Sequence, residues 1–140
     1  PVYVLSDLMD RKIRRTAEIR LLSPFDNAII HRDRIQRFFG FDYRIECYTP
    51  REKRQYGYFC LPILFGNTFI GRVDCKAHRS NKQLELIHLH IEQQIDFDLW
   101  IEPFVRTIKD FAAFNNCESI KLTQISPDNP SLFLLLSNGF

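Results

Sequence analysis

The chain has 140 residues, 45% of them hydrophobic and 13 of them Phe, so it is long and apolar enough to bury a real core. Its formal net charge is only +2, so the overall charge gives no reason to expect an anionic partner. The charge is unevenly spread, because residues 1–60 carry 12 Lys/Arg against 8 Asp/Glu and residues 61–140 carry 7 against 9. These numbers predict one domain with a local basic patch.

The four cysteines show no C-x-x-C spacing, and neither a signal peptide nor a long apolar span is visible. We therefore expect a protein of the reducing cytoplasm with no membrane partner. The chain begins with Pro1 in place of Met, which favours a piece of a longer protein.

The first elements expected are a short strand over residues 2–5 and a helix over residues 6–15. A second short helix follows the Ser23-Pro24 turn. Asp33 is its expected N-cap, with Gln36 three residues later as in a capping box, and Gly40 suits its C-terminal end. The apolar side chains expected to point inward from this helix are Ile35, Phe38 and Phe39.

A β-meander is predicted next, from alternating apolar and polar residues. Gly66-Asn67 matches a two-residue type II′ hairpin turn. The expected strands cover residues 43–48, 56–65, 69–77 and 84–91. In the third strand the alternation places Phe69, Val73 and Cys75 inward, and Arg72, Asp74 and Lys76 outward.

The tail changes to helical spacing. Pro103 is predicted as the first residue of a helix, residues 119–123 as a further strand, and Asn129-Pro130 as the start of a last helix that Gly139 closes. The expected fold class is therefore α+β, with an antiparallel β-meander curled into a small barrel-like sheet and flanked by helices.

The most specific motifs lie in Leu21–Arg79, which contains LLSPFDN, FGFDYRIE, RQYGYFCLP and GRVDCKAHR. This segment resembles the C-terminal region of YcaQ-like crosslink-repair DNA glycosylases, the winged helix DNA-binding family. The likeness continues weakly through residues 104–112 and 120–122 to the chain end. Two positions depart from the family pattern, because Ile30 stands where Trp is frequent and His78 where Asp is common.

The resemblance implies tandem winged-helix modules followed by this β-rich part, and excision of alkylated or crosslinked bases from DNA. It divides the chain into residues 1–20, a linker or the end of a preceding module, and residues 21–140, the β-rich C-terminal domain. The family's catalytic Gln-x-Gln or Gln-x-Asp motif lies upstream of the signature, so no catalytic residue is predicted in this chain. Gln94-Ile95-Asp96 spells that motif but lies downstream, and we interpret it as coincidence.

The predicted function is a scaffold that contacts the backbone of double-stranded DNA and packs against the winged-helix modules. The alternative is a purely structural or protein-interaction domain. The candidate DNA contacts form three groups: a basic hairpin tip with an adjacent aromatic residue, a row of arginines on the short helix, and two cations on a strand. The same residues are explained equally well as solvated surface charges or as members of salt bridges. These candidates are Arg51, Lys53, Arg54 and Tyr56 in the tip, Arg32, Arg34 and Arg37 in the row, and Arg72 and Lys76 on the strand.

His88 and His90 are two residues apart on an expected strand and so face the same way, with His78 or Cys75 as nearby metal-ligand types. The spacing alone is a weak signal, and packing or surface exposure is the favoured interpretation. The sequence predicts neither a metal nor an organic cofactor.

Overall fold

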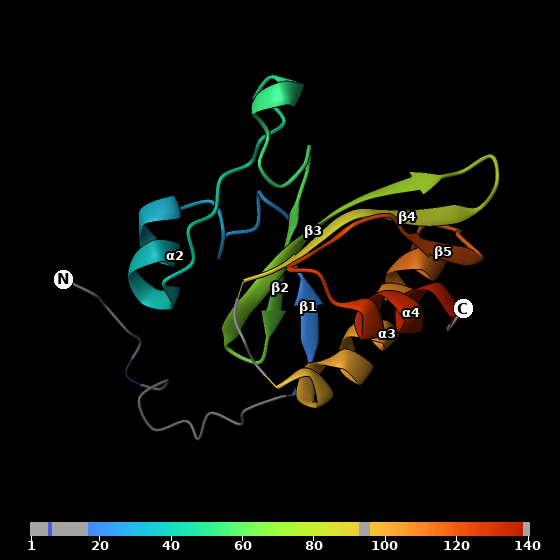
Figure 1. Cartoon of the computed structure of the whole chain (residues 1–140). Coiled ribbons are helices and arrows are strands. Elements are labelled where there is room, and N and C mark those ends of the chain that lie inside the picture. Colours follow the sequence, from blue (N-terminus) through green and yellow to red (C-terminus); the bar gives the residue numbers. More distant parts are fainter. Residues whose placement is uncertain (1–5, 7–16, 93–95, 139–140) are drawn as a thin grey trace.

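The computed structural model describes residues 6, 17–92 and 96–138. The expected strand at 2–5, most of the helix at 6–15, and Gly139 lie outside these residues. The helices and strands in chain order are β1 (Ile19–Leu21), α2 (Arg32–Phe39), the 3₁₀ turn η1 (Arg51–Lys53), β2 (Leu61–Phe65), β3 (Thr68–His78), β4 (Gln83–Ile91), α3 (Phe97–Phe114), β5 (Ser119–Leu122), β6 (Ile125–Ser126) and α4 (Pro130–Asn138) (Figure 1).

The strands form one six-stranded sheet in the order β1-β2-β3-β4-β5, with β6 also pairing β4. The first four are antiparallel neighbours, whereas β5 and β6 run parallel to β4. The predicted α+β class is confirmed, but the barrel-like curl is wrong, because the described strands run from β1 at one edge to β5 and β6 at the other without closing. A parallel strand needs a long crossover, and α3 supplies it between β4 and β5.

Helices α3 and α4 cover one face of the sheet, on the side away from α2 and η1 (Figure 1). In α3 the side chains of Trp100, Phe104, Ile108 and Ala112 recur every four residues and are all buried. In α4 the buried residues are Leu132 and Leu136, which have the same spacing. Each such burial contributes about 1.5–3 kcal/mol for the larger side chains.

The starts of these two helices test the sequence predictions. α4 begins at Pro130 as predicted, and the Asn129 side-chain oxygen accepts the Leu132 N–H at 3.0 Å. α3 begins earlier than predicted, at Phe97, because Asp96 caps it by accepting the Asp98 N–H at 3.2 Å. Pro103 is therefore inside the helix, where its missing N–H leaves one turn without a hydrogen bond.

A second apolar cluster lies on the opposite face of the sheet. It joins Ile29, Ile35, Phe41, Tyr43, Cys60 and Phe69. Of the apolar residues expected to point inward from α2, only Ile35 is buried, while Phe38 is 57% exposed and Phe39 41%. The helix has only eight residues, or about two turns, so few of its side chains can face the core at once. Phe39 still packs edge-on against Phe69, with ring centroids 5.2 Å apart.

Of the two predicted ends of α2, the C-terminal one is confirmed and the N-terminal one is wrong. The helix begins at Arg32 after His31, which makes no side-chain capping bond, so the predicted Asp33 cap is wrong and Asp33 lies in the first turn. Gly40 ends the helix as predicted, with φ +63° and its N–H bonded to the Gln36 carbonyl at 3.0 Å. The Gly66-Asn67 hairpin is also confirmed, since Phe65 pairs with Thr68.

Residues 41–60, which we call the arm, cross the second face of the sheet. The strand predicted over 43–48 is wrong, and the one predicted over 56–65 begins only at Leu61. The expected alternation holds only at its start, where Tyr43 is buried and Arg44 is exposed, because residues 45–47 are all half-buried. Both edges of β2 are already paired, with β1 and β3, so the arm has no strand edge to join there.

The arm changes the environment of β3. Residues 69–74 are buried on both faces of the sheet, so Arg72 (2% exposed) and Asp74 (5% exposed) are not surface residues. They lie on the side opposite Val73 and Cys75, as predicted, but the arm covers that side, so the expected exposure to solvent is wrong. Of the three polar residues expected on that side, only Lys76 is exposed, beyond the end of the arm's cover.

Among the described residues, no helix combines the length and hydropathy needed to cross a membrane.

Candidate nucleic-acid interface

Two carboxylates, in place of a neighbouring strand, accept hydrogen bonds from the backbone N–H groups of the arm. The first is Glu46, which accepts the N–H groups of Gln55 at 2.8 Å, Tyr56 at 2.8 Å and Gly57 at 3.1 Å. Partial burial opposes ionisation of Glu46, but these three donors outweigh it and hold the pKa of its carboxyl below the usual range. The arm therefore folds back on itself around an ionised glutamate.

The second carboxylate is Asp74, which rises from β3 under the arm. Its two oxygens accept the N–H groups of Tyr58 at 2.7 Å and Phe59 at 3.2 Å. Gly57 lies so close that a Cβ there would meet Asp74 Oδ2 at 2.3 Å, and its φ is +151°. Only glycine fits this approach, so Gly57 is a structural requirement of the arm.

Arg72 ties the arm to the centre of the sheet. Its Nε donates to Glu92 at 2.5 Å, and Nη2 donates to the Asp42 carbonyl at 2.6 Å. Its guanidinium also lies over aromatic rings, with centroid distances of 4.8, 5.5 and 4.0 Å to Phe41, Tyr43 and Tyr56 respectively. A buried arginine surrounded in this way is a structural anchor with its donors already engaged.

A chain of hydrogen bonds joins β4, β6 and the arm. His88 Nδ1 lies 3.0 Å from the Tyr56 carbonyl, which can only accept, so Nδ1 carries the hydrogen in this contact. In the neutral ring, His88 Nε2 then accepts from the Ser126 hydroxyl, whose oxygen also lies 3.2 Å from His90 Nδ1. His90 packs against the Tyr56 ring at 4.8 Å. The two histidines thus face the same way, as predicted, and position the arm.

No group of three or more His, Cys, Asp or Glu side chains in the described part of the chain could hold a metal ion. Burial raises the pKa of Cys60 and of Cys75 to about 12, so neither thiol is an activated nucleophile.

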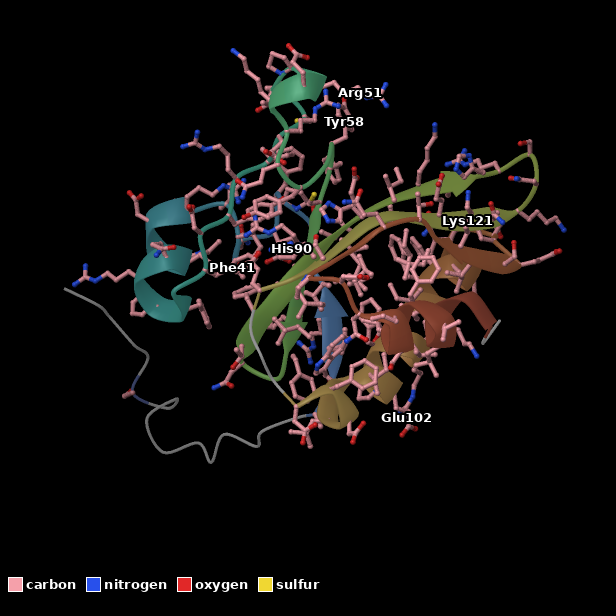
Figure 2. All side chains as sticks on the ribbon, viewed as in Figure 1. Phe41, Arg51, Tyr58, His90, Glu102 and Lys121 are labelled. Atoms are coloured by element: carbon pink, nitrogen blue, oxygen red, sulfur yellow. The ribbon has the colours of Figure 1, made fainter. Side chains whose placement is uncertain are left out.

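Between the arm and the exposed ends of β3 and β4 lies an open cleft of about 920 Å³, which we call the arm cleft. Its lining includes cations, aromatic rings and a histidine, namely Arg51, Arg54, Lys76, Tyr56, Tyr58 and His88. Figure 2 shows Arg51 and Tyr58 at the η1 end of the arm, with Phe41 and His90 nearer the middle of the sheet. The lining holds three cations against one acidic side chain, Asp74, so the cleft presents mainly positive charge.

The fold brings together part of the predicted site. Arg51, Arg54, Tyr56 and Lys76 all line the arm cleft. Lys53 lines a smaller cleft of about 470 Å³ on the other side of the arm. Tyr56 is half-buried between these two clefts.

The predicted basic row on α2 lies apart from both clefts. Arg32 donates to the carbonyls of Ile29 at 2.6 Å and Pro24 at 3.3 Å, and Arg34 donates to the Asn27 carbonyl. These two side chains therefore stabilise the turn before α2, whereas Arg37 is exposed in the last turn of the helix.

Sequence reasoning missed Tyr58, the most exposed aromatic ring of the cleft lining at 54%. Its position two residues after Tyr56 was a signal, because both flank the glycine that brings the arm against Asp74. It also treated Arg54 as a free cation, but Arg54 Nε donates to the Thr49 carbonyl at 2.9 Å and its guanidinium lies 4.9 Å from the centroid of the Tyr58 ring.

An open cleft lined by cations and aromatic rings is the kind of surface found in nucleic-acid-binding domains. A family model described as AlkZ-like, DNA glycosylase AlkZ-like, matches residues 1–113, which include β1–β4, the arm and most of α3. The chain therefore belongs to the AlkZ-like DNA glycosylase family, in agreement with the predicted YcaQ-like resemblance. It is thus a domain related to DNA-repair glycosylases. No solved structure matches the chain.

Proposed function

We propose that this chain is a non-catalytic, DNA-backbone-contacting domain of a glycosylase that removes alkylated or crosslinked bases. The observation that carries the proposal is the arrangement of Arg51, Lys53 and Lys76 around the arm. All three are exposed, and none of their side chains has a hydrogen bond or ion pair within the described residues. Unengaged cations on a rigid support suit phosphate contacts, which fix position without reading sequence.

The support is rigid because the arm is held at several points. Glu46 and Asp74 bind its backbone, and Arg72 binds it to the sheet. The cations at η1 therefore keep a fixed relation to Lys76 on β3. A preorganised arrangement loses less conformational entropy when it binds a phosphate backbone.

The test is equilibrium binding of a duplex oligonucleotide to the chain at several salt concentrations. Three phosphate contacts predict a slope of about −2.7 for log K against log salt. Arg51→Glu with Lys53→Glu should weaken binding and flatten the slope. Arg54 is left intact, because its guanidinium supports Tyr58.

A matched control makes the same charge change on α3, across the sheet from the arm, with Arg106→Glu and Lys109→Glu. These substitutions should change the affinity far less. Equal losses in the two double variants would show that only net charge matters and would overturn the proposed site.

The base-excision step is proposed to reside in the upstream modules of the family. The chain alone should release no base from alkylated DNA, and measurable release would contradict this part of the proposal.

The alternative function, packing against the winged-helix modules, is supported by a separate observation. Large apolar side chains are exposed along α3 and α4, namely Leu99, Phe114, Phe133, Leu134 and Leu135. If duplex DNA does not bind at low salt, this alternative is favoured.

A further inference from the structure

We propose that the arm cleft binds unpaired, single-stranded nucleic acid, with one base stacked on Tyr58. The inference rests on the proposed function, because the cations at the rim of the cleft are the same. It goes further by naming the form of nucleic acid that the cleft takes and the side chain that contacts a base.

The Tyr58 ring is presented for stacking. It is 54% exposed, and the Arg54 guanidinium lies over it at 4.9 Å from the ring centroid. One guanidinium covers one face of a ring, so the other face is left for a partner. An arginine behind the ring also adds a cation–π contact to the stack.

The backbone of Tyr58 and the cation over its ring are both held in place. The Tyr58 N–H donates to Asp74 at 2.7 Å, and Arg54 is fixed by its bond to the Thr49 carbonyl at 2.9 Å. Stacking on a ring that is already ordered costs little side-chain entropy.

The form of nucleic acid follows from the geometry of stacking. In a duplex the face of each base is covered by its neighbours, so an aromatic side chain can stack only on a base that is unpaired or unstacked. A basic groove combined with an aromatic platform is the usual arrangement in proteins that bind single strands. The arm cleft has both, with Arg51 and Lys76 in the same lining as Tyr58.

The size and lining of the cleft agree with such a ligand. Its volume of about 920 Å³ lies near the upper end of the ~300–1,000 Å³ typical of small-molecule sites, and it is open, so a chain can pass through it. Gln55 and Gln124 add side-chain amides that can bond to base edges. Stacking on an aromatic ring does not require one particular sequence, because every base has a π-face.

The experiment compares a single-stranded oligonucleotide of about 12 nucleotides, inside the ~4–16 nucleotide range of such sites, with a duplex of the same length. Tyr58→Ala should weaken single-strand binding by about 5- to 150-fold, because one stacked base contributes about 1–3 kcal/mol. It should change duplex binding by less than about 2-fold, since a duplex offers no base face. Tyr58→Phe should bind like the unaltered chain.

Tyr48→Ala is the matched control, because Tyr48 is 86% exposed and lies on the arm but does not line the arm cleft. If Tyr58→Ala and Tyr48→Ala bind single strands equally well, the inference is overturned. Tyr58→Leu guards against a folding defect, because it keeps apolar bulk but has no π-face, and Tyr58→Phe accounts for the lost hydroxyl. Tyr58→Leu should weaken single-strand binding as Tyr58→Ala does.

The outcomes separate this inference from the proposed function. Salt-dependent duplex binding without any effect of Tyr58 on single strands refutes the stacking site alone. Absence of binding to both DNA forms refutes the proposed backbone contacts and the stacking site together.

Discussion

A methyl group at Gly57 is expected to lift the arm from the sheet. In Gly57→Ala the added carbon would lie 2.3 Å from Asp74 Oδ2 and 2.5 Å from Asp74 Cβ, and the backbone φ of +151° disfavours any L side chain. The backbone strain costs about 1–3 kcal/mol. The steric overlap costs about 1–3 kcal/mol more. We therefore expect a loss of about 2–6 kcal/mol in the free energy of unfolding.

Gly40→Ala is the control for this substitution. Gly40 also has a positive φ, +63°, but a Cβ there would meet nothing within 4 Å. Its cost is the backbone strain alone, about 1–2 kcal/mol. Urea unfolding followed by the fluorescence of Trp100, the single tryptophan, measures both variants.

Function gives a second readout of the same change. Because the arm carries the cations of η1, Gly57→Ala should also weaken duplex binding, while Gly40→Ala should not. Equal destabilisation by the two substitutions, with unchanged DNA binding in both, would refute the argument that the contact with Asp74 sets the position of the arm.

Three further substitutions test what holds the arm. Arg72→Met leaves Glu92 without its cation and should cost about 3 kcal/mol in urea unfolding; a loss below about 1 kcal/mol would show that the anchor is dispensable. Glu46→Gln removes a carboxylate with a lowered pKa, so its destabilisation should be largest above about pH 5 and should shrink as acid protonates Glu46 in the unaltered chain. Burial, Arg72 and His88 lower the pKa of His90, so the folded state resists its protonation and stability falls as the pH drops below about 6.5. His90→Asn should therefore reduce the difference between urea midpoints at about pH 7.5 and 5.5, and an undiminished difference would assign the pH dependence to other groups.

The sequence predicted several local features correctly. Gly40 ends α2, Gly66-Asn67 turns the β2–β3 hairpin, and Pro130 begins α4. Each of these depends on the backbone preferences of one or two residues, which neighbours far along the chain do not alter. The family was also readable from the motifs of Leu21–Arg79, and the family match confirms it.

The sheet topology needed the tertiary structure. The predicted meander holds for β2, β3 and β4, which are antiparallel neighbours, but β5 and β6 add to the free edge of β4 in parallel after α3. Strand periodicity predicts that a segment is extended and does not predict its partner. Short strands such as β1 and β6 gave too little pattern to be recognised.

In the candidate site, too, some features follow from the sequence and others only from the tertiary structure. The sequence alone determined that cations and tyrosines are concentrated around residues 51–58, and that Arg72 and Asp74 share one side of a strand. Only the tertiary structure decided that this side is covered by the arm, so that Arg72 and Asp74 became its buried anchors while Arg51, Lys53 and Lys76 stayed exposed. The physical reason is that alternation along a strand determines which side a residue faces, whereas burial depends on what the rest of the chain lays over that side.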